Sequence, residues 1–174
     1  MPPLLVVVTG APGVGKTTLG QALAHALELT LISKDDVKEA LFDSIGTGDR
    51  AWSQKLGIAS FDLLFLFARR VLEAGGSCVL DANFTRVEPL LALPAERVVQ
   101  FFCTAPRDVV LARYASRERH PGHLDAEIAD ELLERFDAGE WQPLDLPGET
   151  IVVDTTGRVD VDALVQRVKT TFTA

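Results

Sequence analysis

Short apolar runs alternate along this chain with longer segments in which apolar residues recur at helical spacing. Continuous apolar runs are typical of buried strands, and they occur at Leu4–Val8, Leu29–Ile32, Cys78–Asp81, Val98–Cys103 and Ile151–Asp154. The segments between them predict helices, one carrying Leu19, Ala22, Leu23, Ala26 and Leu27, the others over Asp35–Asp43, Ala51–Ala74, Pro106–Arg117, Asp125–Asp137 and Val161–Phe172. Strands separated by helices indicate an α/β fold, in which helices cover both faces of a parallel sheet.

Composition narrows the class of protein. With 174 residues, 47% apolar and 24% charged, the chain fits one globular domain, which we place over residues 1–174. A net charge of −8 argues against nucleic acid or an anionic membrane as partner. The two cysteines form no C-x-x-C pair, which favours a reducing, cytoplasmic setting. The apolar runs are too short to predict a signal peptide or a membrane span.

A glycine-rich segment follows the first predicted strand. It reads Gly10-Ala11-Pro12-Gly13-Val14-Gly15-Lys16-Thr17-Thr18, and its first eight residues fit the phosphate-loop pattern G-x-x-x-x-G-K-[ST]. Between a strand and a helix, such glycines let backbone N–H groups converge on phosphate oxygens, and the helix N-terminus adds partial positive charge. Lys16 is expected to reach the β- and γ-phosphates, and the Thr17 hydroxyl to bind Mg²⁺. A plain glycine turn with a capping threonine would not explain the lysine, so we predict a nucleoside triphosphate site.

The motifs that are missing narrow the kind of nucleotide protein. A small regulatory GTPase needs a guanine-reading N-K-x-D segment, and the sequence contains none. ABC and hexameric AAA+ ATPases are longer and carry further motifs. The size of the chain and its acidic residues fit better with a small kinase, in which the phosphate loop serves transfer of a phosphoryl group to a second substrate.

Four further segments resemble a group of P-loop kinases. They are Ile32-Ser33-Lys34-Asp35-Asp36-Val37-Lys38, Val79-Leu80-Asp81-Ala82-Asn83, the pair Arg113-x-x-x-Arg117, and Val153-Asp154-Thr155. The group includes polynucleotide 5′-kinases, chloramphenicol phosphotransferase, zeta toxins, gluconate kinases and AAA-type ATP-binding proteins. The resemblance covers most of the chain. It implies a three-layer P-loop NTPase fold with a five-stranded parallel sheet of order 2-3-1-4-5, and an arginine-bearing lid over about residues 114–126.

The resemblance places a general base after the second strand. In such kinases an aspartate of an S-x-D-x-x-R segment takes the proton of the acceptor hydroxyl, and here this aspartate is Asp35. Lys38 stands where an arginine contacts a substrate phosphate in polynucleotide kinases, and it lacks the bidentate fork of arginine. Alternatively, Ser33 and Asp36 form a capping-box-like helix start. We expect Asp35 to be the base and Asp36 to be structural, since capping needs only one acid.

The third strand ends in residues suited to a metal or an acceptor. Asp81 ends a strand expected next to the first one, so its carboxylate would hold Mg²⁺ directly or through water, as a Walker-B acid does. Asn83 would hydrogen-bond the acceptor or orient Asp81. Asp and Asn are also favoured in turns, and a plain turn remains the alternative.

Positive charge gathers after the fourth strand. Arg113 and Arg117 share one helix face, and Pro121-Gly122 breaks the helix and provides a hinge. Closing over ATP, these arginines would neutralise the transferred phosphoryl group and exclude water. By resemblance, Arg113 lies near the adenine and Arg117 contacts phosphates. The alternative is a solvated helix end whose basic residues complement the dipole.

Four other residues near the lid and the last strand have weaker assignments. Arg119 is a second candidate for the phosphate contact. His120 and His123 lack the further ligands of a metal site, which favours a role in the hinge or in substrate contact. By resemblance, the loop at Thr155 borders the adenine, although a plain strand-to-helix turn explains it equally.

These features predict an ATP- and Mg²⁺-dependent phosphotransferase acting on a hydroxyl of a small molecule. We expect the acceptor between Asp35, Asn83, the helix from residue 51 and the lid. Further candidate lining residues are Arg50, Trp52, Arg86 and Trp141, although tryptophan and arginine at such positions more often serve packing or lie on the surface. A polynucleotide 5′-kinase is one alternative, which the negative charge disfavours, and a toxin-like kinase of a nucleotide sugar is another. A nucleotide-dependent switch with slow ATP hydrolysis is an alternative of a different class.

Overall fold

The computed structural model describes residues 2–116 and 120–170, and only the backbone of residues 125–129. Its strands are β1 (Leu4–Thr9), β2 (Thr30–Ser33), β3 (Cys78–Asp81), β4 (Arg97–Thr104) and β5 (Glu149–Asp154). Its helices are α1 (Lys16–Leu27), α2 (Lys34–Ile45), α3 (Arg50–Glu73), α4 (Glu88–Leu91), α5 (Arg107–Ser116), the 3₁₀ turn η1 (Pro121–His123), α6 (Asp125–Asp137) and α7 (Val161–Thr170).

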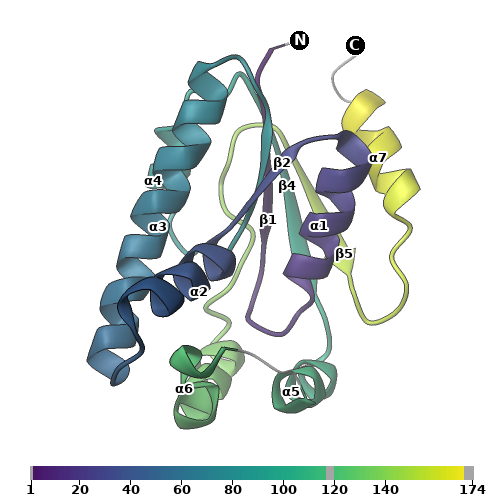
Figure 1. The fold of residues 1–174 in the computed structure, drawn as a ribbon. Coiled ribbons are helices and arrows are strands. Elements are labelled where there is room, and N and C mark those ends of the chain that lie inside the picture. Colours follow the sequence, from purple (N-terminus) through teal and green to yellow (C-terminus); the bar gives the residue numbers. More distant parts are fainter. Residues whose placement is uncertain (1, 117–119, 171–174) are drawn as a thin grey trace.

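The strands form one parallel sheet in the order β2-β3-β1-β4-β5, which confirms the predicted order (Figure 1). The register pairs Asp81 of β3 with Val8 of β1 on one side and with Ser33 of β2 on the other. These three strands therefore end at the same level. Because parallel strands present their carboxyl ends at one edge, the loops that follow them meet there, as in other open α/β sheets.

Alternate residues of β1 point to opposite faces of the sheet, as the pleat requires. Val6 and Val8 belong to an apolar cluster with Leu19 and Leu23 of α1, whereas Val7 packs in a second cluster with Leu64 of α3. Figure 1 shows α1 and α7 on one side of the sheet and α3 on the other. The predicted arrangement of helices on both faces is confirmed, and the three layers follow from the fully apolar run in β1.

Helix α3 is the long element of the second face, and its bounds lie one residue before those predicted at each end. The carboxylate of Asp49 caps its start by accepting a hydrogen bond of 2.9 Å from the backbone N–H of Trp52. Its buried residues include Leu56, Leu64 and Leu72, while charged residues occupy other positions. No helix in the described ranges combines the length and the apolar content needed to cross a membrane.

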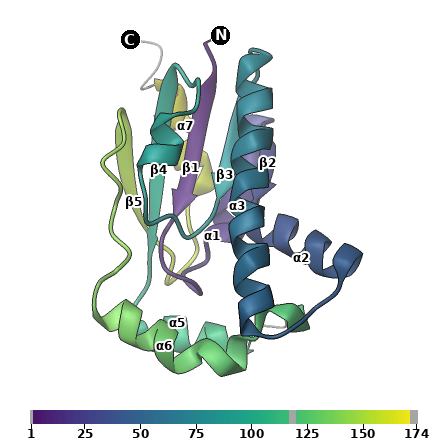
Figure 2. The same ribbon diagram turned by 90° about the vertical axis from the view of Figure 1, so that its left-hand side faces the viewer.

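Helices α5 and α6 lie beyond the carboxyl ends of the strands, and α2 projects from the same end (Figure 2). The predicted bounds of β3 and α6 match the structure, whereas α4 and η1 were not predicted, because segments of three or four residues carry no periodicity. The predicted lid, residues 114–126, spans the end of α5, η1 and the start of α6. Arg117 and Arg119 in it lie outside the described residues.

Candidate active site

The phosphate loop connects β1 to α1 at the carboxyl edge of the sheet. Gly15 occupies the N-cap position of α1 with φ of 90°, a left-handed conformation that glycine adopts without strain, and no side chain caps the helix. The first N–H groups of α1 are therefore available to an anion, and the dipole of the helix favours negative charge there. The Lys16 ammonium group folds back over the loop and donates a 2.8 Å hydrogen bond to the carbonyl of Ala11.

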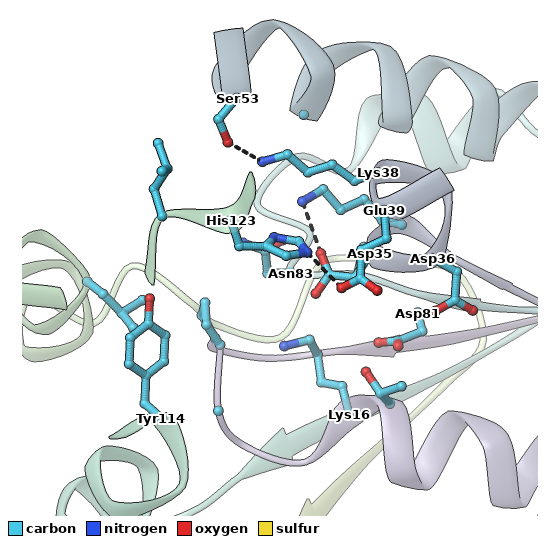
Figure 3. A pocket seen from close by; sticks show the side chains of 18 of the residues that line it. Lys16, Asp35, Asp36, Lys38, Glu39, Ser53, Asp81, Asn83, Tyr114 and His123 are labelled. Carbon is cyan, nitrogen blue, oxygen red and sulfur yellow. Dashed lines mark hydrogen bonds and ion pairs between the residues drawn. The ribbon is translucent and has the colours of Figure 1, made fainter. Parts of the chain in front are cut away.

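A cavity of about 630 Å³ opens at this loop. Its lining residues come from the phosphate loop, α2, α3, β3, α5 and α6, and they include Gly13, Lys16, Thr17, Thr18, Asp35, Asp36, Lys38, Asp81, Asn83 and Arg113 of the residues singled out from the sequence. The phosphate-loop residues Gly10, Ala11 and Val14 do not line it, and the latter two are buried in the core beneath. One cavity thus brings together the phosphate loop and both acidic segments, as Figure 3 shows for the labelled side chains.

Asp81 lies at the centre of this arrangement and is 3% exposed. Burial raises the pKa of its carboxyl, while the positive charge of Lys16 and a hydrogen bond from Thr17 act to lower it. The hydroxyl of Ser33 also contacts Asp81, at 3.4 Å. The capping-box interpretation of Ser33 is therefore wrong, because Ser33 is the N-cap of α2 but makes no side-chain capping bond. The neighbouring strand draws its hydroxyl towards Asp81 instead.

The two aspartates that begin α2 have different surroundings. Asp35 is an ion-pair partner of Lys34, with 3.1 Å between Nζ and Oδ1, and its side chain is 41% exposed. Asp36 is exposed; partial desolvation by its neighbours raises the pKa of its carboxyl, and repulsion by the charge of Asp35 raises it further. Asp35 also acts to raise the pKa of Asp81, so these carboxylates lie close enough to interact electrically. A cation or a proton bound among them would relieve that repulsion.

The donors at the loop suit a hard divalent cation. A hydroxyl on Thr17 and a buried carboxylate on Asp81 are oxygen ligands of the kind that Mg²⁺ prefers. Within the described ranges, no group of three or more His, Cys, Asp or Glu side chains is arranged to hold a metal ion. The two donors therefore fit a Mg²⁺ ion that takes its other ligands from phosphate oxygens and water, rather than from a protein cage.

On the far side of the cavity, α2 meets α3 and the turn η1. Lys38 is buried, and its Nζ donates a 2.9 Å hydrogen bond to the hydroxyl of Ser53. The imidazole Nε2 of His123 lies 2.8 Å from Oε1 of Glu39. Neither Ser53 nor Glu39 was predicted. The position of Glu39, four residues after Asp35 on one helix face, could have indicated it, whereas nothing in the sequence marks Ser53.

Arg113 and Thr155 meet behind the phosphate loop. The guanidinium group of Arg113 donates hydrogen bonds to Oγ1 of Thr155 at 3.2 Å and to its carbonyl at 2.6 Å. The same hydroxyl lies 2.5 Å from the carbonyl of Val14 and 3.0 Å from that of Thr104. Thr155 is buried and does not line the cavity. Its contacts are with the backbone of the phosphate loop and with Arg113, and Arg113 does line the cavity.

The candidate lining residues at the acceptor side divide into two groups. Arg50 lines the cavity, where it pairs with Glu131 of α6. Trp141 does not line the cavity, and its burial in the core matches the packing role that was the alternative for it. Arg86 lines a separate hollow near β3, and Trp52 does not line the cavity but donates a 3.0 Å hydrogen bond to the carbonyl of Gly46. Aromatic and arginine residues near a site in sequence carry too little pattern to place them within it.

Residues 5–138 match the family AAA_33, described as an AAA domain. The uncharacterized protein Rv2004c of Mycobacterium tuberculosis is 31% identical over 146 residues, which cover 75% of this chain and 29% of that protein. A protein of Mycobacterium bovis, uncharacterized protein Mb2027c, matches equally. The chain thus spans less than a third of the length of these curated relatives.

Solved structures agree with the family. A crystal structure from Chloroflexus aurantiacus, whose kinase designation is provisional, is 38% identical with a TM-score of 0.89 and covers 99% of this chain and 100% of that one. Two further solved structures share the fold. A shikimate kinase from Bacteroides thetaiotaomicron is 18% identical with a TM-score of 0.55, and the match covers 100% of both chains. A gluconokinase from Sinorhizobium meliloti is 15% identical with a TM-score of 0.57, and the match covers 98% of this chain and 91% of that one. The chain is therefore similar to P-loop kinases, as its motifs predicted.

Proposed function

The chain belongs to the AAA_33 family of AAA domains, and from that premise we propose that it is an ATP- and Mg²⁺-dependent phosphotransferase. It would move the γ-phosphate of ATP to a hydroxyl group of a small molecule. The observation that carries this proposal is the shared cavity: Lys16, Asp81 and Asp35 line one space of about 630 Å³, which is large enough for two substrates to meet. A protein that only hydrolysed ATP would need no second, polar half of the cavity beyond Asp35.

The phosphate loop would hold the donor. The N–H groups at the start of α1 and the ammonium group of Lys16 would bind the β- and γ-phosphates, because they supply positive charge where no side chain caps the helix. Thr17 and Asp81 would hold Mg²⁺, which when bound neutralises charge on the phosphates. As the resemblance implies, Arg113 would lie near the adenine, and Arg117, which is outside the described residues, would contact phosphates. Fixed positive groups of this kind lower the barrier without having to reorganise during transfer.

Asp35 would serve the acceptor. Its carboxylate would accept the proton of the acceptor hydroxyl as the oxygen attacks the γ-phosphorus, and the bond to the bridging oxygen of ADP breaks. Its exposure of 41% suits a group that a diffusing substrate must reach. Asp36, at the start of the same helix, would remain structural, since its negative charge complements the helix N-terminus. Lys38 and Asn83 would hold the acceptor, since both line the cavity near Asp35.

The acceptor half of the cavity favours a hydrophilic molecule without an aromatic ring. Tyr114 is the single Phe, Tyr or Trp among its described lining residues, and it lies beside the phosphate loop, at Gly13. Nucleobases and aromatic antibiotics are bound largely by stacking and apolar contact, and the side chains near Asp35 are instead mixed donors and acceptors such as Glu39, Gln54 and Asn83. This lining supports a hydroxylated small molecule over a polynucleotide end.

Two matched variants test the assignment of the base. Asp35→Asn should lower transfer of the γ-phosphate by roughly 10²- to 10⁴-fold, the usual contribution of a general base, and leave the affinity for Mg·ATP nearly unchanged by calorimetry. Asp36→Asn, one residue along the same helix, should retain transfer. Comparable activity in Asp35→Asn would refute the assignment, and loss of transfer in Asp36→Asn alone would move it to Asp36.

A further inference from the structure

A buried serine connects the acceptor half of the cavity to the turn that closes it. Ser53 is 6% exposed and Lys38 is 8% exposed. The hydroxyl of Ser53 accepts the hydrogen bond from Nζ of Lys38 at 2.9 Å and donates one to the carbonyl of Gly122 at 2.9 Å. The directions are fixed by chemistry, because an ammonium group only donates and the single hydroxyl proton is left for the carbonyl. Figure 3 shows Ser53 and Lys38 joined above Glu39 and His123.

The turn reached by Ser53 is packed closely on α2. We call residues 120–123 the lid turn. A Cβ atom on Gly122 would lie 2.7 Å from the ring of Phe42, so only glycine allows this approach. His120 stacks on the same ring at 5.1 Å, and His123 meets it edge-on at 5.6 Å. Two further contacts flank this ring: Nε2 of His120 lies 3.3 Å from Oδ1 of Asp43, and Nε2 of His123 lies 2.8 Å from Oε1 of Glu39.

The hydroxyl of Ser53 departs from the usual behaviour of a serine in a helix. Such hydroxyls commonly bond the carbonyl four residues earlier, as Ser60 of the same helix does to Leu56 at 2.5 Å. The hydroxyl of Ser53 does not bond the carbonyl of Asp49 but donates to the carbonyl of Gly122, on another element. The side chain is therefore directed out of its own helix, towards groups on two other elements. Among the described residues, the buried hydroxyl has hydrogen bonds with Lys38 and with Gly122.

We propose that Ser53 is a positioning residue that couples the acceptor-binding lysine to the lid turn. This rests on the proposed function, because Lys38 must contact the acceptor. The charge of Lys38 polarises the hydroxyl and strengthens its bond to Gly122, since hydrogen bonds in a chain reinforce each other. Contact of an acceptor with Lys38 and docking of the lid turn are then favoured together, and the coupling is reciprocal. The turn would close over an occupied site and limit loss of phosphate to water.

Amide hydrogen exchange of the full chain without nucleotide tests the connection. The N–H groups of His123 and Leu124 are bonded within the turn, to His120 and Pro121, and report its docking. Ser53→Ala should speed their exchange by about tenfold, as expected for loss of one buried hydrogen bond to a charged network. Lys38→Met should speed it less, because the hydroxyl remains. Ser60→Ala, a matched deletion on the same helix, should leave it unchanged. Equal exchange in Ser53→Ala and Ser60→Ala would overturn the proposal.

Kinetics separate positioning from a general loss of structure. With the acceptor found by the labelled-ATP assay below, Ser53→Ala should raise KM for the acceptor and the share of ATP hydrolysed by water, and leave KM for ATP unchanged. Ser53→Thr, which keeps the hydroxyl, should restore part of the effect. An equal rise in both KM values would overturn the positioning role. Absence of any transfer by the wild type would count against the proposed function, while the exchange experiment would still decide whether Ser53 holds the turn.

Discussion

Thr155 offers a sharp test of how the phosphate loop is held. Thr155→Val keeps the shape of the side chain and removes one buried hydroxyl, which lies 2.5 Å from the carbonyl of Val14. The carbonyl of Thr104 keeps a partner, because the backbone N–H of Thr155 already donates to it at 2.9 Å. Arg113 likewise keeps its 2.6 Å bond to the carbonyl of Thr155. The substitution therefore affects mainly the carbonyl of Val14, which lies in a buried part of the loop.

The size of the effect follows from that one carbonyl. A buried polar group left without its partner costs about 1–3 kcal/mol. For a domain of this length, each kcal/mol lowers Tm by about 2–4 °C, so a loss near the middle of that range predicts a fall of roughly 4–8 °C. Because Val14 belongs to the phosphate loop, KM for ATP should rise as well.

Thermal unfolding and ATP kinetics of two neighbouring variants decide this prediction. Thr156→Val is the control, since that residue is exposed and its hydroxyl contacts only Asp154 among the described residues; its stability should stay within about 0.5 kcal/mol of the wild type. If Thr155→Val unfolds at the same temperature as the control and binds ATP as well as the wild type, the hydroxyl of Thr155 does not anchor the loop.

Two further predictions follow from buried ionisable groups. Burial raises the pKa of Asp81 above its ordinary value of 3.8, so ionisation of this carboxyl destabilises the metal-free fold as the pH rises above 3.8. At pH 7 the Tm of metal-free Asp81→Asn should therefore be no lower than that of the wild type. The variant should also lose the extra stabilisation that Mg·ATP gives the wild type. A lower Tm of metal-free Asp81→Asn would contradict this. Burial also raises the pKa of Cys78 and of Cys103 to about 12. A thiol reagent at pH 8 should therefore modify neither cysteine until guanidinium unfolds the chain. Rapid labelling of the native protein would refute this prediction.

The parts of the site that could be predicted are those that depend on neighbouring residues in the sequence. The phosphate loop is recognisable because its glycines and Lys16 stand at fixed spacing. Asp81 is recognisable because it ends β3, which lies beside β1, the strand that leads into the phosphate loop. The bounds of helix α6 were placed correctly as a helical segment between two predicted strands. These features require only a few consecutive residues, so the sequence displays them directly.

The parts that could not be predicted depend on contacts between distant segments. Ser53 and Gly122 are separated by 69 positions, and no pattern near either residue announces their hydrogen bond. Ser33 has the residue type and place of a capping serine, yet the buried carboxylate of Asp81 on the next strand attracts its hydroxyl. Trp141 was considered for the cavity and is part of the core, because burial of its ring depends on the packing around it. Tertiary packing decided each of these cases.

Transfer of labelled γ-phosphate from ATP tests the central claim most directly. The protein, with Mg²⁺, would be offered pools of hydroxylated metabolites, antibiotics and oligonucleotides, with Lys16→Ala as the control. We predict a labelled small-molecule product, most readily from a hydrophilic acceptor without an aromatic ring, and none with Lys16→Ala. A wild-type protein that binds ATP but passes its phosphate only to water would contradict the account, and a labelled oligonucleotide end as the sole product would contradict its acceptor class.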